Sequence, residues 1–171
     1  AALAAQAASM GLRFIAIVDP CLSPDLARKI QSFGGELLTV STPDQAGNYL
    51  NARLSLAAEI ESDGQWLWTR QYSNPAVVSV HEETTGPEID GQVRAVDELY
   101  VAVSTCGTLS GLSRYFRRHR PELSVTAVDV VGSVALGGEP TARRLTGIGA
   151  ARAPDFDVAG LYDRKAVVEE D

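Results

Sequence analysis

The sequence is poor in the residues that build disulfide scaffolds, nucleic-acid surfaces and membrane spans. Its two cysteines, Cys21 and Cys106, lie far apart and match no metal-ligand spacing, so we expect no metal site and a reducing cytoplasm. The formal net charge of −7 lacks the basic excess that nucleic acids and anionic membranes attract. No apolar run approaches membrane-spanning length, and Ala1–Met10 lacks the basic and strongly apolar regions of a secretory signal.

Helical and strand patterns alternate along most of the 171 residues. Ser23 is expected to cap a helix, with Pro24 at its first position and Asp25 in its first turn. Such alternation builds parallel sheets covered by helices, so the sequence predicts an α/β fold with three α-β-α layers. The predicted helices are Ala1–Met10, Ser23–Phe33, one from Asp44 through Ile60, and Leu109–His119; the predicted strands are Arg13–Val18, Glu36–Val40, Trp66–Trp68, Glu98–Val103 and Ser124–Val131.

The middle of the chain does not follow this alternation. Gln71–Pro75 is rich in turn residues, and His81–Glu88 carries charged and turn residues without clear periodicity. We place a lobe boundary near Tyr72, which makes residues 1–72 part of a smaller N-terminal lobe and residues 73–171 part of a larger one. Within the larger lobe, Gly132–Pro154 is rich in glycine and proline and is predicted to be an ordered loop.

The strongest local signal is Ser104-Thr105-Cys106-Gly107-Thr108, between a predicted strand and a predicted helix. Three hydroxyls and free backbone N–H groups would converge there at a helix N-terminus, which suits an anion. The segment lacks the Gly-Lys-Ser/Thr of a P-loop and the first two glycines of a dinucleotide fingerprint, so a single phosphate fits best. Taken alone, such a turn is more often plain structure.

Further segments occur around this loop in one order. They are Gln71-Tyr72-x-Asn74-Pro75, His81-x-x-Thr84-Thr85-Gly86-Pro87-Glu88-Ile89, Ser104–Thr108, and Gly132-Ser133-Val134 with Gly147-Ile148-Gly149-Ala150. Together they resemble the motifs of the cysteine synthase family, which are fold-type II pyridoxal-phosphate (PLP) enzymes. The resemblance covers about Ala1 to Pro154 and implies the fold of the tryptophan synthase β subunit, with residues 73–171 as part of the PLP-binding lobe.

The resemblance implies PLP as cofactor and assigns residues to it. The cofactor-binding residues would be Ser104, Thr105, Cys106, Gly107 and Thr108 around the phosphate, and Gly147 in the loop that lines the cleft. Cys106 stands where the family has a glycine, so it adds a side chain at a position of close backbone approach.

Some features resemble one branch of the family, which condenses O-phosphoserine with glutamate on the way to 2,3-diaminopropionate. The branch-like segments are Val18-Asp19-Pro20, Asn48-Tyr49-Leu50 followed by Arg53, Gln71-Tyr72, and Val103-Ser104-Thr105. Plain cysteine synthases tend to have glycine in place of Ser104. The resemblance implies that Arg53, Tyr72 and Ser104 contact anionic groups of the substrate and that Gln71 contacts its carboxylate.

The family's Schiff-base lysine motif and its substrate loop are expected upstream of this chain, and a serine that meets the pyridine nitrogen is expected downstream. The only lysines, Lys29 and Lys165, lack the motif's context, so no catalytic residue is assigned. The resemblance implies PLP-dependent β-replacement by the parent protein on small amino-acid substrates, in a homodimer, with this segment alone inactive.

Several alternatives remain open at this point. The parent could be a cysteine synthase that uses sulfide, or the chain could be a non-catalytic fragment or a degenerate binding protein. A thiol enzyme using Cys106 at a helix N-terminus is a weaker option. Arg53 could be a solvated helix arginine, Gln71 and Tyr72 part of a polar turn, and His81 a hydrogen-bonded structural residue rather than a base.

Overall fold

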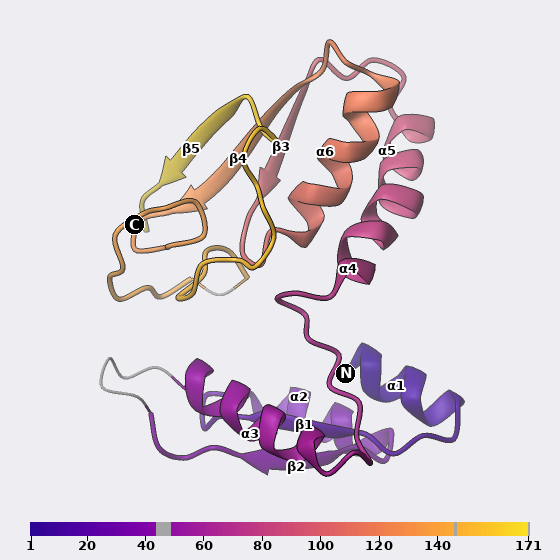
Figure 1. The fold of residues 1–171 in the computed structure, drawn as a ribbon, viewed down its shortest axis with the longest axis vertical. Helices are drawn as coiled ribbons and strands as arrows, with labels where there is room; N and C mark the ends of the chain where they lie inside the picture. The colour runs from indigo at the N-terminus through magenta and orange to yellow at the C-terminus, as the bar shows by residue number, and fades with distance from the viewer. Residues whose placement is uncertain (44–48, 146, 171) are drawn as a thin grey trace. The chain divides into compact units, whose positions relative to one another are not determined.

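The computed structural model describes residues 1–43, 49–145 and 147–170. They form two compact units, Ala1–Trp68 and Thr69–Asp171 (Figure 1). The division falls slightly before the predicted boundary near Tyr72. That the units are parts of a smaller and a larger lobe stays a prediction. No helix in the described ranges combines the length and hydrophobicity needed to cross a bilayer.

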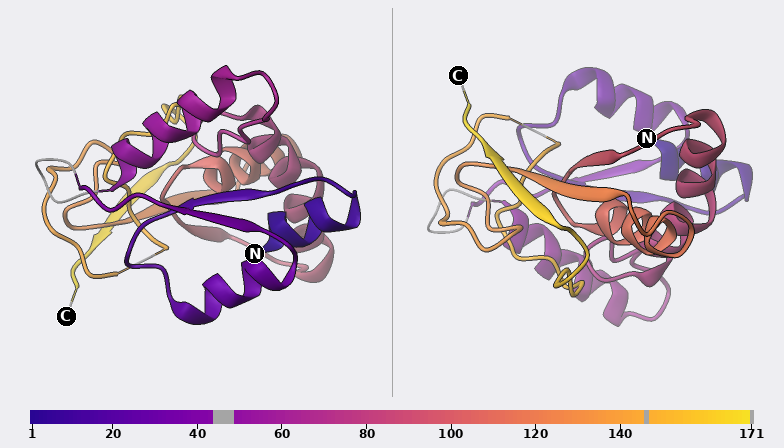
Figure 2. Two further views of the ribbon diagram at one scale, coloured as in Figure 1. Left: turned by 90° about the horizontal axis from the view of Figure 1, so that it is seen from below. Right: turned by 90° about the horizontal axis from the view of Figure 1, so that it is seen from above.

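The first unit is built on two parallel strands, β1 (Ile15–Val18) and β2 (Glu36–Thr39), in a register that pairs Ile15 with Glu36. Helix α1 (Ala2–Ser9) precedes them, α2 (Pro24–Ser32) connects them, and α3 (Leu50–Ser62) follows. Figure 2 shows α2 and α3 on opposite sides of the strand pair. The Ser23 Oγ accepts the Leu26 N–H at 3.3 Å, which confirms the predicted N-cap.

Two predictions for the first unit are not confirmed: one is wrong, and one lies outside the described residues. The strand predicted at Trp66–Trp68 is wrong, because this segment pairs with no described strand. The Trp68 N–H donates instead to the Glu61 Oε1 at 3.3 Å, so a side chain takes the place of a sheet partner. The helix start predicted at Asp44 lies outside the described residues, and α3 is described from Leu50.

The second unit contains a three-stranded parallel sheet in the order β3-β4-β5. Strands β3 (Glu98–Ala102) and β4 (Ser124–Val130) confirm two predicted strands, whereas β5 (Arg164–Val168) had no predicted counterpart. Asp163 attaches β5 to its neighbours: its Oδ2 accepts the Val125 N–H at 2.7 Å, and its Oδ1 accepts the Arg117 guanidinium at 2.8 Å. These long-range contacts, rather than local pattern, define the third strand.

The segment without periodicity in the sequence is helical in the structure. Helix α4 (Pro75–Val80), the π-helix η1 (His81–Thr85) and helix α5 (Gly86–Gln92) follow one another directly. The Asn74 side chain caps α4 by accepting the Ala76 N–H at 2.9 Å. Pro87 reads as a helix breaker, but it lies in the first turn of α5, where no backbone N–H is needed. The sequence analysis found no clear periodicity at His81–Glu88 and assigned it no helix, whereas the structure shows that this segment is helical.

Helix α6 (Gly107–His119) covers one face of the second sheet and buries Leu109, Leu112 and Phe116 in the core of that unit. Its other side packs against α4 and η1, and Figure 1 shows α6 beside α4 and α5. The contact is close at Gly111, where an added Cβ would lie 2.5 Å from the Val78 carbonyl oxygen and 2.9 Å from the Glu82 nitrogen. Only glycine lets the two helices approach this closely.

The architecture confirms an α/β fold built from parallel sheets. On the sheet face away from α6, Tyr100 is 61% exposed and Val168 is 40% exposed. A parallel sheet normally has both faces covered, so this face is the one on which another layer of the three-layer fold would pack.

Replacing Gly111 with alanine should destabilise the second unit. The methyl group would meet backbone atoms that cannot move aside, and overpacking of this kind costs about 1–3 kcal/mol. The free energy of unfolding from denaturant titration measures it. Gly91→Ala is the matched control, because Gly91 lies in α5 with open space around its Cβ position, and this change should be neutral or slightly stabilising. Equal effects of the two changes would contradict the close-packing account.

Replacing Asp163 with asparagine should lower stability at neutral pH but not in acid. The Arg117 guanidinium and the Val125 N–H hold the pKa of Asp163 below its ordinary value. The carboxylate therefore contributes stability above its unfolded-state pKa, and this contribution is lost as pH falls through the lower folded-state pKa. Denaturant midpoints compared at neutral pH and near pH 2 measure the difference, with Asp97→Asn, whose carboxylate has no described partner, as control. A stability loss independent of pH would rule out this role.

Candidate anion-binding site

The loop between β3 and α6 presents a row of free backbone N–H groups. The N–H groups of the five residues from Thr105 to Leu109 donate to no described residue, and the first hydrogen bond of the helix runs from the Ser110 N–H to the Cys106 carbonyl at 2.9 Å. Free amides at the start of a helix carry partial positive charge and bind anions. The predicted anion loop therefore has open donors, and the helix begins at Gly107, inside the segment predicted as loop.

Cys106 has a backbone conformation that normally belongs to glycine. Its φ of 62° and ψ of 6° are left-handed, which costs a side-chain-bearing residue about 1–2 kcal/mol. The side chain is 3% exposed and packs in the core beside Leu109 and Leu112. The thiol thus lies among core side chains, and the backbone of Cys106 has a conformation that glycine adopts readily.

The environment of Cys106 also disfavours a thiol enzyme. Burial, and next the nearby Asp129 carboxylate, raise the pKa of the Cys106 thiol to about 11. The nucleophilic form of cysteine is the thiolate, which this environment keeps protonated at neutral pH. The structure therefore argues against the alternative in which Cys106 attacks a substrate.

The loop that carries Gly147 is tied to the end of β3. The Gly149 N–H donates to the Val103 carbonyl at 2.6 Å, and the Ser133 Oγ accepts the N–H groups of Ala135 and Ala150 at 3.1 and 2.9 Å. Gly147 itself is exposed, with a φ of 88°. The hydrogen bond thus joins Gly149, two residues after Gly147, to Val103, the residue before Ser104. That Gly147 lines the cofactor cleft stays a prediction.

An arginine that the sequence analysis missed joins this loop to Tyr72. The Arg152 guanidinium carbon lies 5.9 Å from the centre of the Tyr72 ring, and its Nη2 donates to the Asp155 Oδ1 at 2.7 Å. Arg152 follows directly on the Gly147–Ala151 stretch, and that position was its only signal in the sequence. Gln71, next to Tyr72, is exposed.

Arg53 belongs to the first unit. Its side chain is 35% exposed, its Nη1 lies 3.5 Å from the Asp19 Oδ2, and its Nε is buried without a described acceptor. It is therefore not a fully solvated helix arginine. Its role toward the substrate stays a prediction, and Asn48 of the same predicted motif lies outside the described residues.

His81 bridges the π-helix and the anion loop. Its Nδ1 lies 3.0 Å from the Thr85 Oγ1, and its Nε2 lies 3.0 Å from the Thr108 Oγ1. This confirms His81 as a hydrogen-bonded residue. It also shows that the Thr108 hydroxyl, one of the predicted phosphate ligands, already has one partner.

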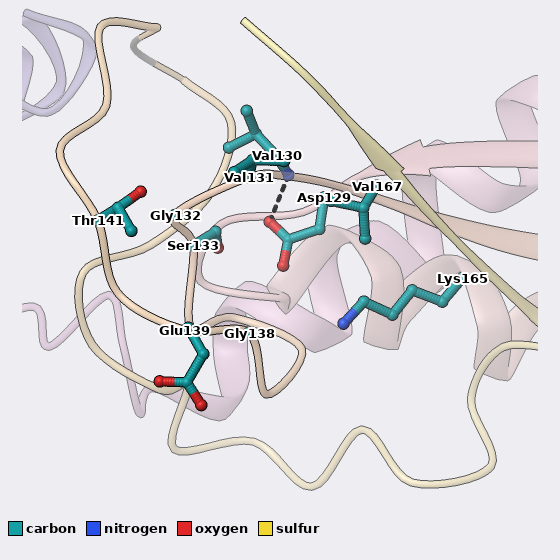
Figure 3. A pocket seen from close by; sticks show the side chains of 10 residues that line it. All are labelled: Asp129, Val130, Val131, Gly132, Ser133, Gly138, Glu139, Thr141, Lys165 and Val167. Atoms are coloured by element: carbon teal, nitrogen blue, oxygen red, sulfur yellow. Dashed lines mark hydrogen bonds between the residues drawn. The ribbon is translucent and has the colours of Figure 1, made fainter.

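A cavity of about 250 Å³ lies at the carboxyl end of β4 and was not predicted (Figure 3). Asp129, only 1% exposed, lines it, and its two carboxylate oxygens accept the N–H groups of Val130 and Leu136 at 2.9 and 3.3 Å. The Lys165 Nζ donates to the Leu136 carbonyl at 2.8 Å. Lys165 is therefore engaged as a structural donor, and the other lysine, Lys29, is an exposed residue of α2. Among the described residues no cluster of three metal-ligating side chains occurs.

The chain matches the model of the family "Pyridoxal-phosphate dependent enzyme" over residues 1–170. It belongs to this family. The family membership confirms the resemblance drawn from the motifs, and it implies PLP as the cofactor.

Relatives and solved structures agree with this family. The chain is 40% identical to an "N-(2-amino-2-carboxyethyl)-L-glutamate synthase" of Ralstonia nicotianae over 91% of its length, and 36% identical over the same share to the protein of that name from Cupriavidus metallidurans. It superposes on 53% of O-ureido-L-serine synthase with a TM-score of 0.86 and 28% identity, over 99% of its own length. An O-acetylserine dependent cystathionine β-synthase from Helicobacter pylori shares the fold, with a TM-score of 0.82 over 98% of the chain and 54% of that protein. The chain covers 46% of each curated relative, which is about half of their length.

The residues of the second unit fit the phosphate of the family's cofactor. The free amides from Thr105 to Leu109 supply donors to a phosphate group, and the Cys106 thiol packs in the core. Ser104, Thr105 and Thr108 add hydroxyls on the same loop. This pattern of donors suits a single phosphoryl group.

Iodoacetamide at neutral pH should label Cys21 and leave Cys106 unmodified. Cys21 is exposed, whereas Cys106 is buried and its raised pKa keeps it protonated. Peptide mass spectrometry of the native and the denatured protein measures both sites, with Cys21→Ser as the control for total labelling. Rapid labelling of native Cys106 would restore the thiol-enzyme alternative.

Proposed function

We propose that this chain supplies the phosphate-binding part of a PLP-dependent β-replacement enzyme. The parent protein would act on O-phosphoserine and use an amine such as glutamate as the incoming nucleophile. The observation that carries the proposal is the row of free N–H groups from Thr105 to Leu109, beside the loop that contains Gly147.

In this proposal the loop holds the cofactor and positions it. The phosphate would lie on the amides of Thr105, Cys106, Gly107 and Thr108, with the hydroxyls of Ser104 and Thr108 adjacent. The Gly149–Val103 hydrogen bond would keep the loop that contains Gly147 next to that phosphate. When bound, the cofactor's ring takes up the negative charge that develops as a proton leaves the substrate's α-carbon. The lysine that would carry the cofactor is expected outside this chain.

The substrate assignment rests on anion-binding groups. Ser104, Tyr72, Arg53 and Gln71 are the proposed contacts to phosphate and carboxylate groups, because hydroxyl, amide and guanidinium donors recognise such anions. Two relatives, 40% and 36% identical to this chain, are named "N-(2-amino-2-carboxyethyl)-L-glutamate synthase", and this name supports glutamate as the amine.

The setting of the enzyme is part of the same proposal. Two free cysteines, one of them exposed, suit a reducing cytoplasm. We place the whole protein there, as a homodimer that handles small amino-acid substrates in precursor biosynthesis. No nucleic-acid or membrane partner is proposed, because the net charge is −7.

A cysteine synthase that uses sulfide is the second candidate for the whole protein. The solved structures that match this chain include O-ureido-L-serine synthase, whose name does not mention glutamate, so the fold alone does not fix the nucleophile. Glutamate is favoured as the nucleophile because the two relatives at 40% and 36% identity are named "N-(2-amino-2-carboxyethyl)-L-glutamate synthase", whereas O-ureido-L-serine synthase is 28% identical.

The full-length protein should release phosphate from O-phosphoserine when glutamate is supplied, and Ser104→Gly should weaken this preference. The hydroxyl of Ser104 would donate to the anionic leaving group, so its loss should raise the KM for O-phosphoserine about tenfold, the effect of one hydrogen bond to a charged group. The KM for O-acetylserine should change little, because its leaving group carries no charge before it departs. Steady-state phosphate and acetate release measure both.

Ser73→Gly is the matched control, because Ser73 is exposed in the turn before α4 and has no assigned role. Turnover with sulfide but not with glutamate would replace the proposal by the cysteine synthase alternative. The absence of turnover with either nucleophile in the full-length protein would favour a binding role.

A further inference from the structure

His81 lies between two hydroxyl groups, and its ring can donate to only one of them when it is neutral. Nδ1 and Nε2 each lie 3.0 Å from a threonine oxygen, Thr85 Oγ1 and Thr108 Oγ1. We propose that an anion on Ser104–Thr108 holds His81 in the Nε2–H tautomer and that His81 thereby positions the Thr108 hydroxyl as an anion donor. This inference rests on the phosphate site of the proposed function.

Counting protons shows what each tautomer leaves unpaired. A neutral imidazole has one N–H donor and one bare nitrogen that accepts, and each threonine hydroxyl has one proton. The two hydrogen bonds at His81 use two of the three protons, so one hydroxyl proton is always left over. The tautomer decides which threonine has it.

In the Nε2–H form the Thr85 hydroxyl donates to Nδ1, and Nε2–H donates to the Thr108 Oγ1. The spare proton is then on Thr108, the second residue of α6, among the free amides of the anion loop. An anion bound there would accept this proton together with the amides.

In the Nδ1–H form the donor and acceptor roles in both hydrogen bonds are reversed. The ring donates to Thr85, and the Thr108 hydroxyl must donate to Nε2. The spare proton then belongs to Thr85, which is half-buried in the π-helix and has no other described acceptor. Thr108 would face a bound anion with lone pairs only, which repel it. The bound anion therefore favours the Nε2–H form.

His119 provides an internal reference of the opposite kind. Its Nδ1 lies 2.8 Å from the Tyr115 carbonyl oxygen, which can only accept. His119 must therefore carry its proton on Nδ1. The sequence has two histidines, so the two ring spectra can be read against each other.

Long-range ¹⁵N–¹H NMR of the histidine rings tests the inference directly on the unmodified protein. At about pH 8, above the ordinary pKa of histidine, the ring nitrogens distinguish the tautomers. Inorganic phosphate is the probe, and amide shifts of Thr105–Thr108 report its binding. With phosphate bound, His81 should show the Nε2–H pattern while His119 keeps the Nδ1–H pattern.

Thr108→Val provides a second measurement. It should weaken phosphate binding about tenfold, the effect of one hydrogen bond to a charged acceptor, and abolish any response of the His81 ring to phosphate. Thr84→Val is the matched control, because the Thr84 hydroxyl donates to the Val80 carbonyl at 2.6 Å and lies outside the His81 contacts. It should leave both readouts unchanged.

The possible results separate this inference from the proposed function. Phosphate binding with His81 in the Nδ1–H form, or equal affinity of the Thr108→Val variant, would overturn the inference and leave the phosphate site standing. No phosphate-dependent shift at Thr105–Thr108 would overturn the proposed site itself and the inference with it.

Discussion

The left-handed turn at Cys106 is the constraint on which the rest of the site depends. At this turn the chain leaves β3 and enters α6, and the amides from Thr105 to Leu109 donate to no described residue. The Cys106 thiol lies in the core, where burial favours its protonated form and raises its pKa. Backbone strain at this residue and the burial of its thiol therefore share one geometric cause, whereas the open donors follow from the start of a helix.

The surroundings of this turn are closely packed, because glycines let their neighbours approach the backbone. Gly111 brings α6 against the π-helix, and that approach brings the His81 ring to Thr108. On the other side, Gly149 has room for no side chain beside Val130, and its N–H bonds the end of β3. A phosphate on this loop would meet donors that are already in place, which lowers the entropic cost of binding it.

Local sequence signals predicted the elements whose causes are local. The Ser23 cap and the β-branched strands β3 and β4 were correctly identified, and the family followed from motifs in order. The loop predicted at Ser104–Thr108 was correct only as far as Cys106, because helix α6 begins at Gly107. The failures have non-local causes. Trp66–Trp68 has strand-like residues but does not pair with any strand in the described part of the chain, and Asp163 ties β5 to β4 and α6. The helices on either side of Thr85 were not predicted, because Pro87 normally ends a helix, whereas here a new helix begins at Gly86 and has the proline in its first turn.

The sequence by itself determined the fold class and the family, since these depend on residue type and order. Only the tertiary structure decided which way the Cys106 side chain points, that His81 meets Thr108, and that Arg152 lies over Tyr72. The physical reason is that a side chain's partner is chosen by packing between distant segments. A sequence records which donors and acceptors exist, whereas the fold decides which of them are left free to bind a ligand.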